Sequence, residues 1–176
     1  MVMKWYNENR WAAVLITLVR VYLGWQWLDA GWHKLTGKEA FDASGFIKGA
    51  VAKPVADHAT NAVIYPNYTY FLEHVVTPSM KLINILIPIG ETLIGLGLIL
   101  GGFTLVAGFF GLVLNFLFLF AGTVSTNPWL LLLGVIVFLA GTNAGRFGID
   151  RYLNPLVQKG WNRVMNKTNK DQAIRS

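Results

Sequence analysis

Two charged side chains stand inside apolar segments, where an ionisable group is able to do chemistry. Arg20 is near the middle of segment 11–30, and Glu91 is near the middle of segment 82–100. A charge at the centre of a bilayer costs about 2.5–3.5 kcal/mol, so such residues should face the protein interior and find a partner. Antiparallel helices would bring both charges to one depth. We therefore predict an Arg20–Glu91 pair, with either a catalytic or a purely structural role.

A second polar group follows at the end of the first apolar segment. Asp29 and His33 are one helical turn apart, close to Trp25, Trp32 and Lys34. An imidazole held by a carboxylate exchanges protons near neutral pH, which suits catalysis. The alternative is a solvated helix end, the commoner role for such a histidine. Asn115, inside a third apolar segment, is another candidate, although asparagine in this setting more often links helices by hydrogen bonds.

The chain carries no obvious cofactor of its own. It has no cysteine, which excludes disulfides, thiolate catalysis and cysteine-held iron–sulfur clusters. None of its three histidines lies deep in an apolar segment, so haem held by two histidines is not expected. We find no metal-ligand motif, no flavin site and no glycine-rich nucleotide motif. Any electrons must therefore pass to a borrowed carrier, such as a lipid-soluble quinone.

The elements that position these residues are four apolar segments. Hydrophobic residues make up 54% of the 176 residues and charged residues 14%, against about 25% charged in a soluble domain. Because about 20 apolar residues cross a bilayer as a helix, we predict an all-α, integral membrane four-helix bundle in one domain, residues 1–176. The expected spans are 11–30, 82–100, 103–121 and 127–144.

The basic residues predict the orientation of these spans. Lys4 and Arg10 precede the first span, and seven further lysines and arginines follow the fourth, whereas the two short turns between spans carry no charge. Positive residues stay on the cytoplasmic side, so we expect a multi-pass protein of a prokaryotic plasma membrane with both termini in the cytoplasm.

The long connection, residues 31–81, should then be external. It contains apolar stripes at helical spacing near 43–51 and 68–75, each followed by a proline. These stripes predict two short amphipathic helices over the outer mouth of the bundle. A loosely ordered loop is the less favoured alternative.

The segment after the fourth span, residues 145–176, is basic. Lys159, Arg163, Lys167 and Lys170 fall on one helical face and apolar residues on another. This pattern is typical of a helix that rests on anionic membrane lipids. Nucleic-acid binding is not expected, because no base-stacking or groove-reading motif accompanies the charge.

Five strings stand out along the chain when they are taken in order. They are Arg20-Val-Tyr-Leu-Gly24, Ala30-Gly-Trp-His-Lys-Leu-Thr-Gly37, Gly90-Glu-Thr-Leu-Ile-Gly-Leu-Gly-Leu-Ile-Leu-Gly-Gly-Phe-Thr104, Ser125-Thr-Asn-Pro128 and Gly145-Arg-Phe-Gly-Ile-Asp150. Their order and spacing resemble the DoxX/DoxD family of small four-helix membrane proteins of bacteria and archaea, and with the long outer loop the chain resembles the DoxD-like branch of that family.

The resemblance implies a quinone-linked redox role. Some DoxD-like proteins are the membrane subunit of thiosulfate:quinone oxidoreductase and work with a second subunit, DoxA; other relatives are tied to oxidative or quinone stress. Arg20, Glu91 and the Gly-Trp-His-Lys string are the matching positions that the resemblance carries over. No DoxA-like segment and no residue set for sulfur chemistry is evident in this chain.

The leading hypothesis is a quinone-reactive subunit of a membrane oxidoreductase, with a possible redox partner subunit and a possible homo-oligomer. The alternative is a non-catalytic membrane scaffold or a small-molecule permeation protein. In the leading hypothesis Glu91 and His33 exchange protons as catalytic groups, while Arg20, Trp27, Lys34 and Asn115 bind the quinone headgroup.

Overall fold

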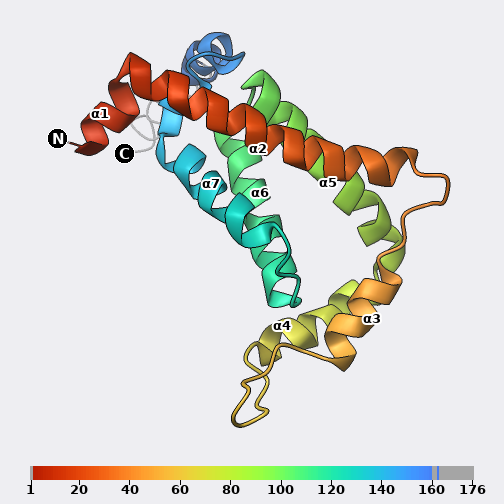
Figure 1. Cartoon of the computed structure of the whole chain (residues 1–176). Coiled ribbons are helices and arrows are strands. Elements are labelled where there is room, and N and C mark those ends of the chain that lie inside the picture. The colour runs from red at the N-terminus through yellow and green to blue at the C-terminus, as the bar shows by residue number, and fades with distance from the viewer. Residues whose placement is uncertain (1, 160–161, 163–176) are drawn as a thin grey trace, which may run out of the picture.

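The protein is all-helical, as predicted, in a computed structural model that describes residues 2–159 and 162. Four helices pack in a ring, in which each contacts the next along the chain and the last contacts the first (Figure 1). They are α2 (Arg10–Thr36), α5 (Met80–Leu100), α6 (Thr104–Phe120) and α7 (Asn127–Leu139). Their shared core includes Ile16, Leu23, Trp27, Leu98 and Val137.

The helix bounds agree with the predicted spans except at two ends. Among the described residues, α2 and α5 are long and apolar enough to cross a membrane, and α6 and α7 are apolar but shorter. Helix α2 continues six residues beyond the predicted end of its span. The predicted fourth span, 127–144, is too long, because Gly141 has φ +56° and the chain turns there into the 3-10 helix η2 (Gly141–Gly145).

Local sequence signals explain where the long helices begin and end. The Asn9 side chain caps α2 by accepting a hydrogen bond of 2.7 Å from the Trp11 backbone N–H. Helix α7 begins with Pro128 in its first turn, where proline loses no needed hydrogen bond. Helix α5 ends at Gly101, whose left-handed φ of +64° favours glycine.

Both short helices expected in the long connection are present. They are α3 (Ser44–Ala52) and α4 (Pro66–Phe71), the latter continued by the π-helical turn η1 (Leu72–Val76). Together they project beyond one end of the ring (Figure 1). Ile47, Ala50, Leu72 and Val76 form a second small core there, which packs on residues at the start of α5.

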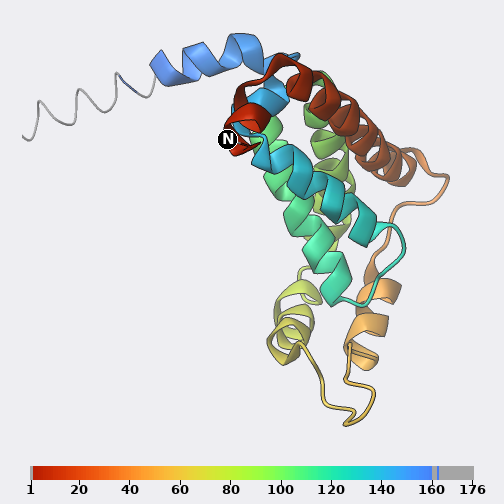
Figure 2. The same cartoon turned by 60° about the vertical axis from the view of Figure 1, so that its left-hand side comes forward.

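The opposite end of the ring carries both ends of the described chain. Helix α1 (Val2–Glu8) packs against α2 and η2, and a helical segment over 150–159 leads away from the bundle (Figure 2). This segment is the start of the predicted basic tail. Lys159 lies in it, whereas Arg163, Lys167 and Lys170 lie outside the described residues.

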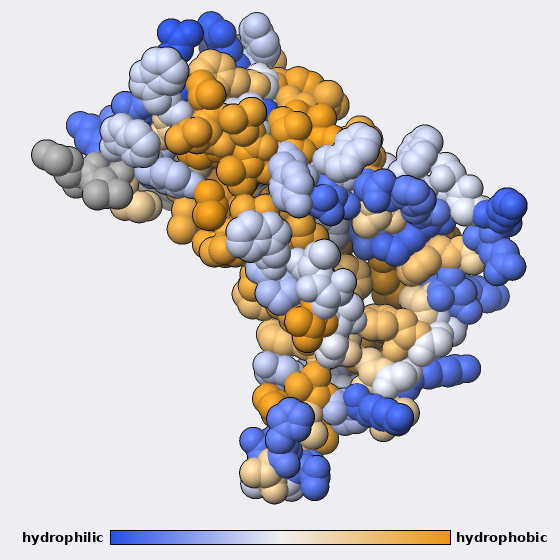
Figure 3. All heavy atoms as spheres, in the orientation of Figure 1, coloured by the Kyte–Doolittle hydropathy of each residue, from blue (hydrophilic) through white to orange (hydrophobic). Residues whose placement is uncertain are grey.

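Large apolar side chains cover the outside of the ring. Figure 3 shows hydrophobic residues gathered over the long helices, with hydrophilic residues toward the ends. An exposed apolar surface of this extent is typical of contact with lipid or another protein. Exposed members of this surface include Leu15, Leu18, Phe109, Phe110 and Leu132.

The register between α2 and α5 is fixed by close approach at glycines. Gly31 faces Thr92, and Gly24 faces Ile99, each at a distance that leaves no room for a Cβ. From Gly31 to Gly24 the chain number falls by seven, and from Thr92 to Ile99 it rises by seven, as expected for antiparallel helices. Small residues let two helices approach in this way.

Candidate functional site

The register separates the two buried charges that sequence reasoning had paired. Arg20 lies beside Gly101, beyond the end of α5, whereas Glu91 lies at the level of Gly31. Eleven residues of helix, about 16 Å at 1.5 Å per residue, divide these levels. The predicted Arg20–Glu91 pair is therefore wrong. Each charge stands near the middle of its own apolar segment, but the helices are offset along their axes.

Arg20 instead belongs to a buried cluster at the turn between α5 and α6. Its side chain is 1% exposed and donates to Thr104 Oγ1 at 3.4 Å and to the Phe147 carbonyl at 3.5 Å. A Cβ at Gly101 would overlap the guanidinium, so the positive φ and the close approach both require glycine there. Asp150 supplies the opposite charge that acts on Arg20.

Sequence reasoning missed Asp150 as the partner of this cluster. Its carboxylate accepts hydrogen bonds from the backbone N–H groups of Phe103, at 2.7 Å, and Thr104, at 2.9 Å. These are free donors at the start of α6, where a carboxylate is favoured. The available signal was the Gly145–Asp150 string, which brings an acidic residue back to the α5–α6 turn. We conclude that the Arg20 cluster joins three distant parts of the chain.

Glu91 pairs with Lys34 and not with Arg20, and Lys34 lies four residues beyond the predicted end of the first span at Ala30. The Lys34 ammonium lies 2.5 Å from Glu91 Oε2, and the Lys34 side chain is 27% exposed while that of Glu91 is 2% exposed. The ammonium also lies 5.6 Å from the centre of the Phe41 ring. The pairing arises because α2 extends to Thr36 and carries Lys34 back over α5.

This ion pair lies in the wall of a cavity of about 390 Å³, which we call the Glu91 cavity. It lies at the end of the ring near α3. All four helices of the ring contribute to its walls, together with α3, the segment before α3, and the connection between α6 and α7. Apart from Lys34 and Glu91, the lining is mostly aromatic, aliphatic and hydroxyl-bearing, and it includes Trp27, Phe41, Phe46, Ile87, Phe118, Thr126, Asn127 and Leu130.

The other predicted site residues occupy different places. Trp27 is buried and lines the Glu91 cavity. His33 does not line it: its side chain is 75% exposed, and Nδ1 lies 2.8 Å from the Asp29 carbonyl oxygen. Asn115 is buried one helical turn before Phe118, and its Oδ1 has no hydrogen-bond partner among the described residues. The structure thus brings Trp27, Lys34 and Glu91 together.

Asp42 adds a negative charge to the cavity lining. Hydrogen bonds from the Ser44 hydroxyl, the Ser44 backbone N–H and the Asn84 side chain lower the pKa of Asp42 below its ordinary value. These donors favour the ionised form, and Asp42 is thus a carboxylate at neutral pH. Three carboxylates thus line the cavity, those of Asp29, Asp42 and Glu91, and Asp42 and Glu91 are held by separate partners, Asn84 and Lys34.

Asn127 is a cavity residue that sequence reasoning did not single out. Its side-chain Nδ2 donates to the Thr123 carbonyl at 2.9 Å, across the connection between α6 and α7. The Ser125-Thr-Asn-Pro128 string contained it, and three residues of this string line the cavity. Because an ammonium, a carboxylate and an amide adjoin aromatic walls, the cavity can bind a flat polar headgroup and exchange protons with it.

An all-helical ring with apolar outer faces and a polar cavity at one end defines a class of small membrane protein. The family model described as "TQO small subunit DoxD" matches residues 15–171, nearly the whole chain. The chain belongs to the DoxD family, and the resemblance inferred from its sequence is confirmed. No curated protein and no solved structure matches the chain.

Proposed function

We propose that the chain is the quinone-reactive membrane subunit of an oxidoreductase of the thiosulfate:quinone type, and that the Glu91 cavity takes the quinone headgroup. One observation carries this proposal: a buried carboxylate and an ammonium meet in a cavity walled by aromatic side chains. Membership of the DoxD family supports the same class of reaction.

The chemistry of the cavity fits a quinone. A volume of about 390 Å³ is within the range of small-molecule sites, about 300–1,000 Å³. A quinone ring is flat and apolar and carries two carbonyl oxygens. Trp27, Phe46 and Phe118 offer flat apolar surface, and Lys34 and Asn127 offer donors for a carbonyl oxygen.

A bound quinone accepts two electrons and two protons and leaves as the quinol. In this proposal the two electrons come from the donor, through a second subunit, and the two protons come from water at the mouth of the cavity. Lys34 binds a carbonyl oxygen and favours the negative charge that develops there. Glu91 takes up each proton at Oε2 and passes it to a quinone oxygen, and after each transfer it is again the carboxylate that Lys34 holds in place. Arg20 has no part in this step, because its cluster lies at the other end of the ring.

The proposal includes the arrangement in the membrane. The four long helices span the plasma membrane, both termini lie in the cytoplasm, and the Glu91 cavity lies near the outer surface beneath α3. The basic residues at both ends of the chain support this orientation. The exposed apolar side chains of the ring support contact with lipid.

A purely structural role is the second candidate, because Glu91 is already neutralised by Lys34. Removing one partner of a buried ion pair is strongly destabilising, whereas replacing both by uncharged residues of similar size is often tolerated. The double variant Lys34→Met/Glu91→Gln therefore separates the two roles. If the pair is structural, this variant should assemble and keep its function; if the pair is functional, it should assemble and lose it.

The experiment measures quinone binding to the purified full chain in lipid nanodiscs. The probe is menadione, a naphthoquinone without a long tail, and equilibrium dialysis measures its binding. Because a hydrogen bond to a charged group contributes about 1.5–3 kcal/mol, we expect Lys34→Met/Glu91→Gln to raise the Kd roughly tenfold or more.

Lys38→Met is the matched control, since Lys38 does not line the cavity. His33→Gln tests the histidine that the sequence favoured, and we expect it to bind as the wild type does. The proposal fails if the wild type shows no saturable binding, or if the double variant assembles and binds menadione with unchanged affinity.

A further inference from the structure

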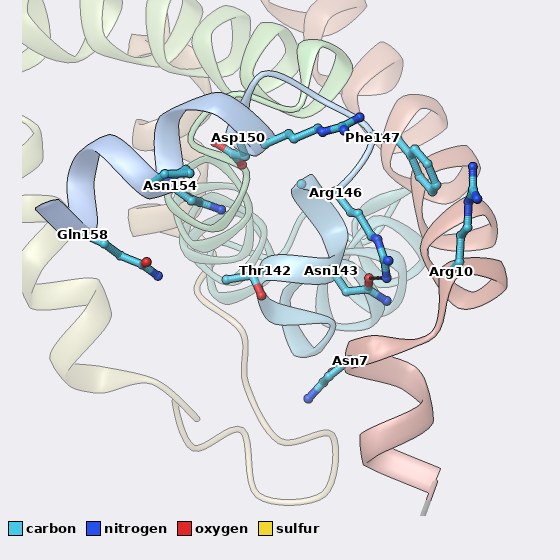
Figure 4. A pocket seen from close by; sticks show the side chains of 12 residues that line it. Asn7, Arg10, Thr142, Asn143, Arg146, Phe147, Asp150, Asn154 and Gln158 are labelled. Atoms are coloured by element: carbon cyan, nitrogen blue, oxygen red, sulfur yellow. Dashed lines mark hydrogen bonds between the residues drawn. The ribbon is translucent and has the colours of Figure 1, made fainter.

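A second and larger cavity lies at the opposite end of the ring from the Glu91 cavity. Its volume is about 700 Å³, and we call it the Arg146 cavity. Polar side chains reach it from α1, from the region of η2 and from the segment over 150–159 (Figure 4). The proposed quinone chemistry leaves this cavity without a role.

Positive charge dominates the lining. Arg10, Arg146 and Arg151 contribute three guanidinium groups, against one carboxylate, that of Asp150. Asp150 is engaged by the Phe103 and Thr104 backbone N–H groups, as described above. The lining therefore favours an anion with several acceptor oxygens, the kind of group that arginine binds best.

The three guanidinium groups differ in how many of their hydrogen bonds are already made to the protein. Arg146 donates to the Glu8 carbonyl at 2.7 Å and to Asn143 Oδ1 at 3.5 Å, which fixes it in the wall. Within residues 2–159 and 162, Arg10 and Arg151 take part in no ion pair closer than 4 Å. Their donors remain available to a ligand.

An apolar groove of about 440 Å³ continues from this cavity along α2. Arg10, Trp11, Val14 and Phe147 line it, so the groove and the Arg146 cavity share Arg10 and Phe147. These two side chains lie next to each other at one edge of the cavity (Figure 4). Trp11 is 75% exposed, and tryptophan favours the boundary between lipid and water. A charged cavity that opens into an apolar groove matches a molecule with an anionic head and a hydrocarbon tail.

We propose that the Arg146 cavity and this groove bind one anionic phospholipid of the cytoplasmic leaflet, with the phosphate at Arg10 and Arg151 and an acyl chain along Trp11 and Val14. The site joins α1, α2 and the segment over 150–159, which leads away from the ring (Figure 2). A lipid bound there connects α1 to the segment over 150–159 at the membrane surface.

Native mass spectrometry of the detergent-purified full chain tests this proposal. The probes are phosphatidylglycerol and phosphatidylcholine with identical acyl chains. We expect one phosphatidylglycerol to bind at least about tenfold more tightly than phosphatidylcholine, because both headgroups carry a phosphate but only phosphatidylcholine adds a choline cation, which the guanidinium groups of the lining repel. The variant Arg10→Gln/Arg151→Gln should abolish this preference.

The control is Lys4→Gln/Lys159→Gln, which removes two positive charges from the same end of the molecule but none from the cavity lining. It should retain the preference for phosphatidylglycerol. Equal losses in the two double variants would show diffuse attraction to negative charge and would overturn the site. Displacement of the lipid by glycerol phosphate at equal concentration would also overturn the proposal, in favour of a soluble phosphate ester.

Discussion

At the scale of single residues, the two deeply buried charges, Arg20 and Glu91, lie at opposite ends of the ring, and each has its own polar partners. Arg20 donates to the Thr104 hydroxyl, the Thr104 backbone N–H donates to Asp150, and Glu91 pairs with Lys34 in the Glu91 cavity. A charge in a dry interior is tolerated when it is paired and its hydrogen bonds are made. We therefore expect substitutions in the Arg20 cluster to lower stability, and substitutions in the Glu91 cavity to impair quinone binding.

Asp150→Ala should strongly destabilise the protein. The change leaves Arg20 buried without its opposite charge and frees two backbone N–H groups at the start of α6. Leaving a buried donor without its acceptor costs about 1–3 kcal/mol, so the midpoint of thermal unfolding in detergent, followed by circular dichroism, should fall clearly. Asp150→Asn keeps one acceptor oxygen and should fall less. A melting curve for Asp150→Ala that matches the exposed-site variant Asp57→Asn would contradict this account.

Tyr68 should titrate at unusually high pH. Burial raises the pKa of Tyr68 to about 12, and its hydroxyl donates to the Leu117 carbonyl at 2.8 Å. Because the folded-state pKa lies above the unfolded value near 10, the folded form is favoured fully below pH 10, and this contribution is lost as pH rises from about 10 to about 12. Tyrosinate absorbance should show a late step that Tyr68→Phe removes and Tyr70→Phe, at an exposed position, leaves in place. A Tyr68→Phe curve that keeps this step would refute the assignment.

The types of the functional residues were readable from sequence, but their pairing was not. Arg20, Glu91, Lys34 and Trp27 stood out because charge and aromatic residues are conspicuous in or beside apolar segments. Pairing depends on the axial offset of two helices, and periodicity specifies which face a residue is on, not its level relative to a neighbour. Asp150 lies after the last apolar segment, where no hydrophobic periodicity indicates which way its side chain faces.

At the scale of elements, glycine sets how closely α2 and α5 approach. A Cβ on Gly31 would lie 2.5 Å from the backbone N of Thr92 and 2.8 Å from the Pro88 carbonyl oxygen. Gly31→Ala should therefore push the helices apart and cost about 1–3 kcal/mol, as overpacking does. Gly90→Ala is the matched control, because nothing lies within 4 Å of a Cβ there, and alanine is the better helix former.

Thermal unfolding in detergent measures both glycine variants. We expect a lower midpoint for Gly31→Ala and an equal or higher one for Gly90→Ala. Gly31→Ala should also weaken menadione binding, because it displaces Lys34 from Glu91 one turn away. Equal midpoints for the two variants would show that the α2–α5 contact adapts without cost.

The elements themselves were largely predictable. Long apolar runs predicted the four long helices, and amphipathic stripes predicted α3 and α4. The errors were at helix ends: α2 continues through the polar residues of the Trp-His-Lys string, and α7 ends at Leu139, shortly before Gly141 takes a positive φ. A helix end that depends on backbone conformation or on packing against another segment has only a weak local signal.

At the scale of the whole molecule, the two cavities lie at opposite ends of one ring of helices. The core between them consists of tightly packed apolar side chains such as Leu23, Leu98 and Val137. In the proposed orientation, the quinone cavity lies near the outer surface and the lipid site near the cytoplasm. The orientation is therefore the property on which both proposals depend.

The orientation is directly testable because the chain has no cysteine, so a single introduced thiol is the only labelling site. Ala59→Cys lies in the exposed connection between α3 and α4, and Lys4→Cys lies at an exposed position in α1. A membrane-impermeant maleimide added to intact spheroplasts should label Ala59→Cys and should label Lys4→Cys only after permeabilisation. Labelling of both in detergent is the control for reactivity. The reverse pattern would show that the orientation is the opposite of the one proposed. Labelling of both positions without permeabilisation would place them on the same side of the membrane, and α2 would then not cross it. Since α2 is the long apolar helix between these two positions, opposite accessibility is the direct consequence of its crossing the bilayer.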